Sequence, residues 1–395
     1  MSFNAELNRR LATLREQNLF RELRRVDSPQ SPHIQFAGST FLNFSSNDYL
    51  GLANHPVLKE AAIRATEKYG AGAGASRLVC GSLAPFHELE DALAAFKKTE
   101  AALMFSTGYA AALGCIGALL GGDDVIILDK LVHACIVDAA KLSGAKIRIF
   151  AHNDLEDLED KLKWAASSRK GPNAECQVLI VTESIFSMDG DAAPLREIAT
   201  LKDKYGAWLM VDEVHATGIF GKNGGGLADE LGVSDRIEIQ MATLGKALGS
   251  SGGCICGSRP LIDLLINRAR SFIFSTAPSP ASAAVATAAI QLAQSAEGAQ
   301  LRRKLQTNIA EFQFTRGIRP AEVSSAIIPL ILGDETKAVE AAAKLREQSI
   351  FIPAIRYPSV ARGAARLRVT LTAAHSSSDI GRLTGALKTL GIDHP

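Results

Sequence analysis

Short apolar runs, separated by segments long enough to form helices, constrain the fold of this chain more than any other feature. The runs lie at 102–105, 124–128, 146–150, 177–182, 207–212, 237–242 and 253–256. Strands that are apolar throughout are buried on both faces, and strands that alternate with helices form mostly parallel sheets. The sequence therefore predicts an α/β fold with functional side chains at the carboxyl ends of the strands.

The residues before and after this alternating region have different sequence patterns. Leucines at 7, 11, 14 and 19 have helical spacing and predict that residues 1–26 form an amphipathic helix. A charged helix is expected at 85–98, an Ala-rich helix at 281–295, and later strands at 326–332, 351–356 and 366–371. We therefore expect an N-terminal helix and arm (1–45), a large domain (46–285) and a smaller α+β domain (286–395). The smaller domain is expected to pack with the N-terminal segment, because chain termini commonly lie together.

Charge and composition exclude several classes of function. The 395 residues include 43 basic and 42 acidic side chains, a net charge of +1, so neither nucleic acid nor a membrane surface is an expected partner. Six cysteines lack CxxC spacing, which indicates reduced thiols and, without a secretory signal at the charged N-terminus, a cytoplasmic protein. The uncharged run 101–122 contains Ser106, Thr107 and Gly108, and we interpret it as strand, turn and helix rather than a membrane span.

Several common motifs are missing. The sequence contains no G-x-G-x-x-G, P-loop, H-E-x-x-H or G-x-S-x-G, and no cysteine-based zinc pattern. A metal site is therefore not predicted.

A lysine in the stretch 237–253, IEIQMATLGKALGSSGG, is the first candidate for chemistry. Lys246 follows an apolar strand and has only small residues around it, which leaves room for a large, flat ligand to approach its amine. A buried lysine with a lowered pKa is the usual Schiff-base nucleophile. The alternative is an ordinary surface lysine in a glycine-rich loop.

The segment Val211–Gly218 (VDEVHATG) is the strongest polar signal. Asp212 ends an apolar strand, where a carboxylate is costly unless a cation pairs with it, and a protonated ring nitrogen of a cofactor is such a cation. His215 follows and can donate a hydrogen bond to a ring oxygen. The alternatives are a helix-capping aspartate with a structural histidine, or a metal site that includes Glu213.

Four further clusters are candidates for function. Ser106–Tyr109 opens a helix after a strand, a position that favours an anion, although such a turn more often serves only as a helix cap. Thr182–Gly190 is a polar loop at a strand end. His133 lies among apolar residues, either in the core or against a ligand. Arg368 alternates with apolar residues on a strand and requires a carboxylate from the protein or a substrate.

Taken together, these segments resemble the α-oxoamine synthases, a family of pyridoxal-phosphate (PLP) enzymes with the fold type I transferase architecture. The motifs that carry the resemblance are NFSSNDYLGL (43–52), FSTGY (105–109), HACIVDAA (133–140), TESIFSMDGD (182–191), VDEVHATG (211–218), TLGKALG (243–249) and RLRVTLTAAH (366–375). They occur in order over most of the chain, and as a set they are specific.

The resemblance assigns roles to individual positions. Lys246 is expected to bind PLP covalently, Asp212 to pair with the pyridine nitrogen, His215 to bind the ring hydroxyl and His133 to stack on the ring; these four are the catalytic candidates. The other cofactor positions are Gly108, Tyr109, Ser187 and Thr243, with Ser275 and Thr276 reaching the phosphate from the partner subunit of a homodimer. The substrate positions are Arg21, Asn47, Ser76, Ser359 and Arg368, and Arg368 is expected to take the amino-acid carboxylate.

Within the family, the motifs favour the member that joins L-alanine to a pimeloyl thioester in biotin biosynthesis. CoA and an acyl carrier protein are both possible carriers of the acyl group. Ser76 leaves more room than the threonine of glycine-using relatives, and Ser359 stands where dicarboxylate-using members often have threonine. The alternatives are a glycine-using member (2-amino-3-ketobutyrate CoA ligase or 5-aminolevulinate synthase) and a catalytically silent protein of the same fold.

Overall fold

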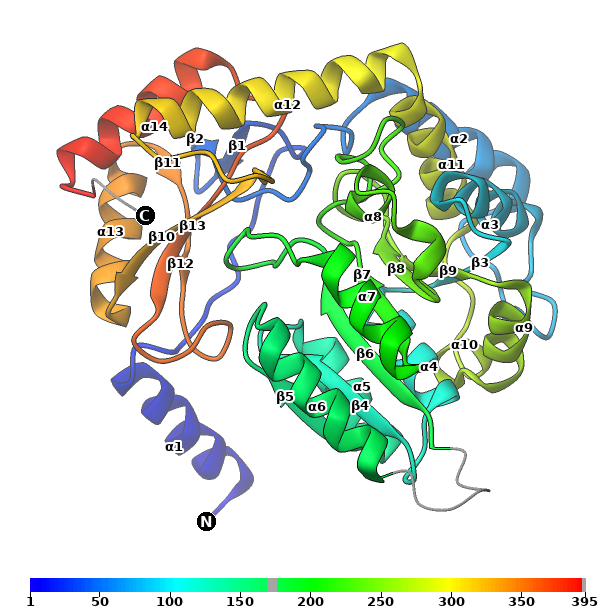
Figure 1. Ribbon diagram of the computed structural model, residues 1–395. Coiled ribbons are helices and arrows are strands. Elements are labelled where there is room, and N and C mark those ends of the chain that lie inside the picture. The colour runs from blue at the N-terminus through cyan, green and yellow to red at the C-terminus, as the bar shows by residue number, and fades with distance from the viewer. Residues whose placement is uncertain (169–175, 393–395) are drawn as a thin grey trace. The chain divides into compact units, whose positions relative to one another are not determined.

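The computed structural model describes residues 1–168 and 176–392, which form two compact units (Figure 1). The larger unit comprises 50–187 and 191–302, and the smaller comprises 1–49, 188–190 and 303–395. The chain therefore passes from one unit to the other after Tyr49 and after Arg302. The domain boundaries predicted from the sequence lie after residues 45 and 285. The division into three domains stays a prediction.

The larger unit is built on one sheet that contains all seven expected strands. In chain order these are β3 (Ala101–Phe105), β4 (Val125–Asp129), β5 (Lys146–Phe150), β6 (Val178–Glu183), β7 (Trp208–Asp212), β8 (Ile239–Thr243) and β9 (Gly253–Gly257). Their order across the sheet is β3-β9-β8-β7-β6-β4-β5. Strands β4 to β8 pair in parallel, and β9 runs antiparallel to both β3 and β8. The expected mostly parallel sheet is confirmed.

Helices cover the sheet on both faces, as its apolar strands require. They are α2 (Pro56–Tyr69), α3 (Ala84–Lys97), α4 (Gly108–Leu119), α5 (Ala134–Ser143), α6 (Leu155–Ser168), α7 (Leu195–Tyr205), α8 (Leu227–Glu230), α9 (Arg259–Arg268), α10 (Arg270–Ile273) and α11 (Pro280–Gln294), with a 3₁₀ turn at Ser234–Arg236. In Figure 1, α6 and α7 lie in front of the sheet and α4 and α5 behind it. The run 101–122 forms β3, a turn and α4, as expected.

The smaller unit combines both ends of the chain. Its elements are α1 (Phe3–Glu16), β1 (His33–Phe36), β2 (Ser39–Asn43), β10 (Ile327–Gly333), α13 (Glu335–Glu347), β11 (Ile350–Phe351), β12 (Ala354–Ile355), β13 (Ala365–Thr370) and α14 (Ser377–Thr389). Helix α12 (Ala296–Thr315) begins in the larger unit and continues into the smaller one. The sheet β1-β2-β11 joins N-terminal to C-terminal residues, which confirms their expected packing.

Two expected elements differ from the structure. The N-terminal helix ends at Glu16, because Asn18 adopts a positive φ of 54° and the N–H groups of Leu19 and Phe20 bond back to the carbonyl of Leu14. The strand expected at 351–356 is divided at Pro353, which lacks an N–H. Its halves are β11, which pairs with β2, and β12, which pairs with β13.

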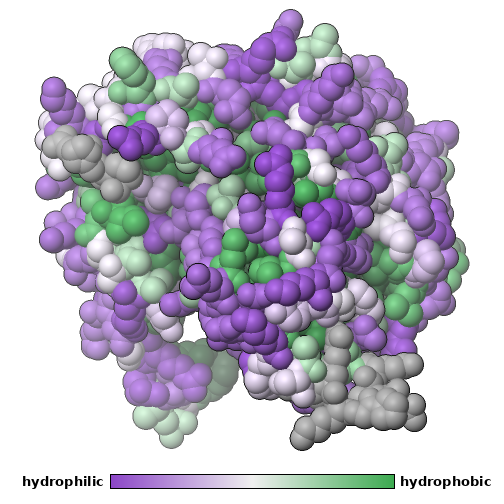
Figure 2. Space-filling view, in the orientation of Figure 1, coloured by the Kyte–Doolittle hydropathy of each residue, from purple (hydrophilic) through white to green (hydrophobic). Residues whose placement is uncertain are grey.

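The surface and the cysteines agree with the composition. No helix within the described residues is long and apolar enough to cross a membrane. On the face shown in Figure 2, hydrophilic side chains predominate and hydrophobic residues gather in small groups between them. All six cysteines are free thiols, and four of them are buried.

Candidate active site

The site in the larger unit lies where its parallel strands end. Strands β4, β6, β7 and β8 finish in the polar residues Asp129, Glu183, Asp212 and Thr243. Glu183 and Asp212 stand directly opposite each other in the ladder between β6 and β7. Because parallel strands end at the same edge of a sheet, the topology gathers these side chains at one place.

Asp212 is a buried carboxylate held by the turn that follows β7. Its Oδ1 accepts a hydrogen bond of 2.9 Å from the N–H of Val214, and the residue is only 4 % exposed. Burial raises the pKa of Asp212 to about 6, although the charge of Lys246 and the Val214 N–H act in the opposite direction. A carboxylate in this position is stabilised by any cation that approaches it.

Lys246 reaches the same place from the loop after β8. Its Nζ lies 3.0 Å from Nε2 of His215, which is buried. The loop makes a close approach at Gly249, which has a φ of +61°, and a Cβ there would lie 2.6 Å from the backbone nitrogen of Ala53. Glycine is therefore required to bring the lysine into place. The structure unites Lys246, Asp212 and His215, as the sequence predicts.

Glu183 is a member of this cluster that the sequence analysis does not select. Its Oε2 accepts the N–H of Ser187 at 3.2 Å, and its Oε1 is buried without a hydrogen-bond partner among the described residues. Burial and the neighbouring Asp212 raise the pKa of Glu183 well above its usual value. Its position at the end of a strand, in the motif TESIFSMDGD, is the signal that could have identified it.

His133 caps the N-terminus of α5, where its Nδ1 accepts the N–H of Cys135 at 3.2 Å. The residue is exposed rather than in the core, so the core interpretation does not hold. Desolvation by neighbouring protein atoms, followed by the charge of Lys246, lowers the pKa of His133. Its ring is therefore neutral near pH 7 and is suited to stacking on a ligand.

The start of α4 packs tightly against β8 and β9. A Cβ on Gly108 would lie 2.5 Å from Cγ2 of Thr243, and one on Gly253 would lie 2.5 Å from Cα of Gly108. Thr107 caps the helix by accepting the N–H of Ala110 at 3.0 Å. The Oγ1 of Thr243 is buried and has no hydrogen-bond partner among the described residues. Gly108 and Thr243 therefore meet at a helix N-terminus, where an anion is favoured.

The other predicted cofactor residues lie in varied environments. The hydroxyl of Tyr109 donates to Oδ2 of Asp138, which raises the pKa of Tyr109. Ser187 is half-buried next to Glu183. Thr276 forms an isolated β-bridge with Ser76, so a predicted cofactor residue and a predicted substrate residue are neighbours. Ser275 is half-buried beside it.

Three of the predicted substrate residues form contacts within the smaller unit. Arg368 is 8 % exposed and donates to Oδ1 of Asn47 at 3.1 Å and to Oγ1 of Thr370 at 2.9 Å. Arg21 donates to the carbonyl of Tyr357 at 3.1 Å. Ser359 is exposed, and the structure gives no contact between it and Arg21 among those it describes.

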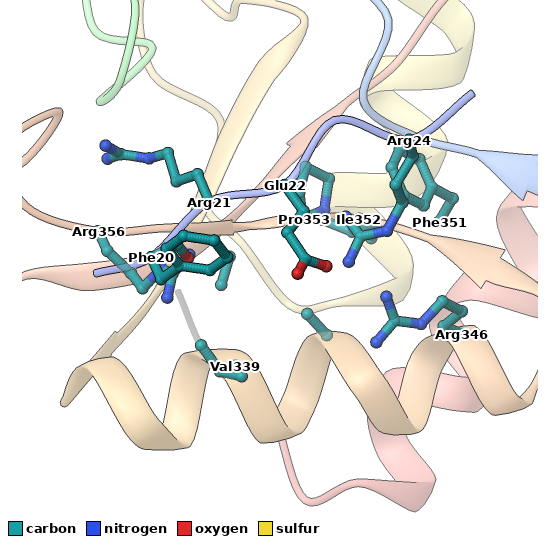
Figure 3. A pocket seen from close by; sticks show the side chains of 12 residues that line it. Phe20, Arg21, Glu22, Arg24, Val339, Arg346, Phe351, Ile352, Pro353 and Arg356 are labelled. Atoms are coloured by element: carbon teal, nitrogen blue, oxygen red, sulfur yellow. The ribbon is translucent and has the colours of Figure 1, made fainter. Parts of the chain in front are cut away.

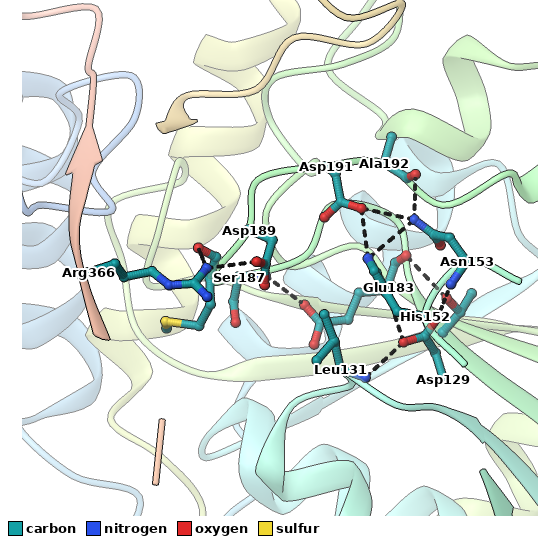
Figure 4. A network of polar contacts seen from close by, with 12 residues as sticks. Asp129, Leu131, His152, Asn153, Glu183, Ser187, Asp189, Asp191, Ala192 and Arg366 are labelled. Carbon is teal, nitrogen blue, oxygen red and sulfur yellow. Dashed lines mark hydrogen bonds and ion pairs between the residues drawn. The ribbon is translucent and has the colours of Figure 1, made fainter. Parts of the chain in front are cut away.

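A second polar network, also missed by the sequence analysis, supports the loop after β6 (Figure 4). His152 joins Oδ1 of Asp129 at 3.0 Å to Oδ2 of Asp191 at 2.7 Å, and Asn153 also donates to Asp191. Burial alone lowers the pKa of His152, but its two carboxylate partners outweigh this and raise it to about 10. In the smaller unit, Arg366 pairs with Asp189 at 2.7 Å. The described residues include no group of His, Cys, Asp or Glu that could hold a metal ion.

Comparison with known proteins places this arrangement in a family. The family model of aminotransferase class I and II matches residues 39–387. The chain belongs to the aminotransferase class I and II family. It is 46 % identical over 386 residues to 8-amino-7-oxononanoate synthase of Geotalea daltonii and 45 % identical over 384 residues to that of Geobacter sulfurreducens, with 96 % of each chain covered in both cases.

Solved structures of related enzymes have the same fold. Serine palmitoyltransferase of Sphingomonas wittichii gives a TM-score of 0.89 at 32 % identity, covering 99 % of this chain and 98 % of that one. Serine palmitoyltransferase of S. paucimobilis with a bound PLP–myriocin aldimine gives 0.89 at 28 %, covering 99 % and 100 %. For 8-amino-7-oxononanoate synthase of Francisella tularensis the TM-score is 0.73 at 28 %, covering 89 % and 98 %. The resemblance to the α-oxoamine synthases and their fold type I architecture is confirmed.

Proposed function

We propose that this chain is a PLP-dependent acyltransferase that condenses L-alanine with a pimeloyl thioester. The reaction gives 8-amino-7-oxononanoate, CO₂ and the free thiol, a step of biotin biosynthesis. The identity of 46 % over 96 % of a curated 8-amino-7-oxononanoate synthase supports the reaction. The observation that carries the proposal is the position of the Lys246 amine, 3.0 Å from His215 Nε2 and close enough to the buried Asp212 to influence its charge.

The residues of the larger unit fit PLP. Asp212 is a buried carboxylate with a raised pKa, and the protonated pyridine nitrogen is the cation that would stabilise it. Gly108 and Thr243 meet at the N-terminus of α4, and the buried Oγ1 of Thr243 has no hydrogen-bond partner among the described residues, so a phosphate would find a hydroxyl and a helix dipole there. When bound, PLP supplies an electron sink for the bonds broken at the α-carbon of the amino acid.

Each residue of the cluster then has a defined task. Lys246 would hold the cofactor through its aldehyde group, and its amine would move the proton at the α-carbon of the amino acid. Asp212 keeps the ring nitrogen protonated, and His215 donates to the ring hydroxyl. His133, whose lowered pKa keeps it neutral, stacks on the ring and donates to the oxygen of the thioester carbonyl as negative charge develops there.

The substrate assignments rest on the resemblance and on the environment of each residue. Arg368 takes the amino-acid carboxylate, because its buried guanidinium carries the forked donors that match a carboxylate. Asn47 assists it. Ser76 leaves space for the methyl group of alanine. Arg21 and Ser359 contact the acyl group, which CoA or an acyl carrier protein delivers.

We further propose a cytoplasmic homodimer with shared active sites. Ser275 and Thr276 lie on a Pro-bounded segment that is suited to reaching the PLP phosphate of the partner subunit. Tyr109 and Ser187 complete the set of cofactor contacts.

A substrate matrix tests the proposed reaction. Glycine, alanine and serine are each combined with acetyl, succinyl, pimeloyl and palmitoyl thioesters, and products are followed by mass spectrometry and CO₂ release. We expect alanine with the pimeloyl thioester to give the highest kcat/KM, although one methyl group discriminates by only about 1–3 kcal/mol.

The other cells of the matrix identify the alternatives. Serine with palmitoyl thioester is included because serine palmitoyltransferases share the fold at a TM-score of 0.90. Glycine with acetyl-CoA and no CO₂ would indicate a ketobutyrate ligase, and glycine with succinyl-CoA an aminolevulinate synthase. A protein that binds PLP but turns over none of the pairs would be catalytically silent.

A further inference from the structure

A cavity in the smaller unit carries an excess of positive charge. Its volume is about 490 Å³, and it is lined by the arm 20–24, one face of α13 and the segment 351–356. Four arginines line it, namely Arg21, Arg24, Arg346 and Arg356, together with a single carboxylate, that of Glu22. We call this cavity the arginine groove. All of its lining residues belong to the smaller unit, so its geometry does not depend on the larger one.

Within the described residues, none of the four guanidinium groups forms an ion pair with a carboxylate, although the charge of Glu335 acts on Arg356. Nearby arginines do form ion pairs, such as Arg25 with Asp27 at 2.6 Å, but within the described residues none of the four in the groove does. Their contacts are to neutral groups instead. Arg21 donates to the Tyr357 carbonyl at 3.1 Å, and Arg356 donates to the carbonyls of Asn18 and Phe20.

The electrostatic cost of this arrangement is visible at Arg356. Burial, followed by repulsion from the neighbouring Arg21, lowers the pKa of Arg356. Among the lining residues, Glu22 sets one carboxylate against four cations, and outside them the charge of Glu335 raises the pKa of Arg356 in part. An anion that enters the groove would relieve the repulsion and find forked donors whose geometry matches a carboxylate.

The groove also has an apolar part between its charged ends. Figure 3 shows Arg21 and Arg356 toward one end and Arg24 and Arg346 toward the other, with Ile352, Pro353 and the carboxylate of Glu22 between them. Phe20 and Phe351 add aromatic surface, and the guanidinium of Arg24 lies 5.9 Å from the ring centroid of Phe351. Apolar lining residues favour the binding of an aliphatic chain, whereas they contribute nothing to the binding of a phosphate ion.

From these features we infer that the arginine groove binds an aliphatic chain that ends in a carboxylate. Arg24 and Arg346 hold the carboxylate, and Pro353 and the two phenylalanines contact the methylene groups. Two sources share this chemistry, namely a free dicarboxylic acid and the distal carboxyl of the acyl donor. The second source rests on the proposed function; the binding chemistry itself does not.

Calorimetric titration of the PLP-loaded protein with pimelate tests the inference. Arg24→Gln and Arg346→Gln remove one charged donor each, and Arg382→Gln on α14 is the matched control, since it is exposed and does not line the groove. We expect each groove variant to bind pimelate about tenfold or more weakly, as for other lost charge-assisted hydrogen bonds, and the control to bind like the parent. Thermal melting verifies that all three variants are folded.

Two results would overturn the inference. One is equal affinity of the groove variants and the Arg382→Gln control for pimelate. The other is binding of inorganic phosphate that is as tight as that of pimelate and equally sensitive to Arg346→Gln, because the apolar floor would then contribute nothing. Neither result depends on turnover, so the proposed reaction can fail while the groove assignment stands.

Kinetics then separate the two sources. If the distal carboxyl of the donor occupies the groove, Arg346→Gln raises KM for the pimeloyl thioester far more than for its methyl ester, and free pimelate competes with the donor. If a free dicarboxylic acid is the ligand, pimelate binds without raising the KM of the donor. Either pattern supports a carboxylate-ended chain as the ligand.

Discussion

Two lysines contact the same short segment, 212–217, and their environments differ. Lys97, at the end of α3, is fully buried, with its Nζ 2.5 Å from Oε2 of Glu213 and 2.6 Å from the carbonyl of Gly225. Lys246 is half-buried, and its Nζ faces the imidazole of His215 at 3.0 Å. One lysine therefore has a carboxylate and a carbonyl as partners, and the other has a group that itself binds and releases protons.

This difference indicates a structural role for the charge of Lys97 and a chemical role for the amine of Lys246. When both partners of an ion pair are buried, removing one of them leaves the charge of the other uncompensated in the interior. A lysine that faces a histidine can give up a proton and act as a nucleophile. We therefore expect substitution of Lys97 to lower stability, and substitution of Lys246 to abolish chemistry while leaving the fold intact.

The largest effect is expected for Lys246→Ala. Turnover should fall by at least about 10⁴-fold, which is ~5.4 kcal/mol in the barrier, while the melting temperature changes little because the side chain is half-buried. Lys222→Ala is the matched control, because Lys222 also follows a glycine but is exposed. Steady-state assays and reductive labelling with borohydride measure the outcome. A pyridoxyl label on a lysine other than Lys246 would refute the assignment.

The next effect concerns stability. Lys97→Met leaves the carboxylate of Glu213 buried without its cation, and we expect a loss of roughly 3–5 kcal/mol in the free energy of unfolding. The double variant Lys97→Met/Glu213→Gln should recover most of the lost stability, because glutamine is neutral. Its side-chain oxygen can still accept the N–H of Ala228, which lies 2.9 Å from Oε1 of Glu213 in the parent protein. Urea unfolding checks both. A single variant as stable as the parent would contradict the contrast between the two lysines.

The sequence predicts one side of this contrast and not the other. Lys246, Asp212 and His215 are visible because they follow apolar strands, and the topology of a parallel sheet gathers strand ends. Lys97 and Glu213 are 116 residues apart, and their pairing depends on how α3 packs, which no local pattern encodes. Glu183 becomes distinctive only when the β6–β7 register sets it opposite Asp212.

The arginine groove shows the same limit in the smaller unit. The sequence singles out Arg21 through the resemblance, but Arg24, Arg346 and Arg356 come from segments that only the fold unites. The helix expected within residues 1–26 also obscured the arm that lines the groove, since that arm begins where α1 ends at Glu16.

Asp212→Asn should produce an enzyme that is more stable at neutral pH but nearly inactive. Without a carboxylate to pair with the ring nitrogen, activity should fall by about 10²–10³-fold, or ~2.7–4 kcal/mol. In the cofactor-free protein, the pKa of Asp212 is raised from 3.8 to about 6, so the folded state binds this proton more tightly than the unfolded chain. The resulting stability is fully present below pH 3.8 and is lost as the pH rises through about 6.

The variant lacks this pH dependence. We expect Asp212→Asn without cofactor to melt at a higher temperature than the parent at pH 8, where the parent carries a buried charge, and the difference to shrink toward pH 4. Melting curves of both cofactor-free proteins across this range measure it. A parent protein that is the more stable of the two at pH 8 would show that Asp212 already has an adequate cation in the folded chain.

The smallest effect is expected for Glu183→Gln. This variant extends the comparison from the two lysines to the two buried glutamates, Glu183 and Glu213. Glu213 has a lysine partner, whereas Glu183 has Asp212 beside it, and burial with this neighbour raises the pKa of Glu183 well above the usual value. Because the raised pKa favours the protonated carboxyl group, glutamine imitates the form that the site prefers, and its oxygen can still accept the N–H of Ser187. We expect a change below about 1 kcal/mol in the free energy of unfolding at pH 7, against roughly 3–5 kcal/mol for Glu213→Gln, which strands Lys97. The raised pKa of Glu183 stabilises the parent at low pH, and this contribution is lost as the pH rises through the folded value, so the glutamine variant should become the more stable protein in alkaline solution. Urea unfolding of both variants at neutral and alkaline pH measures the difference, and an equally large loss for Glu183→Gln and Glu213→Gln at pH 7 would contradict the contrast between the two carboxyl groups.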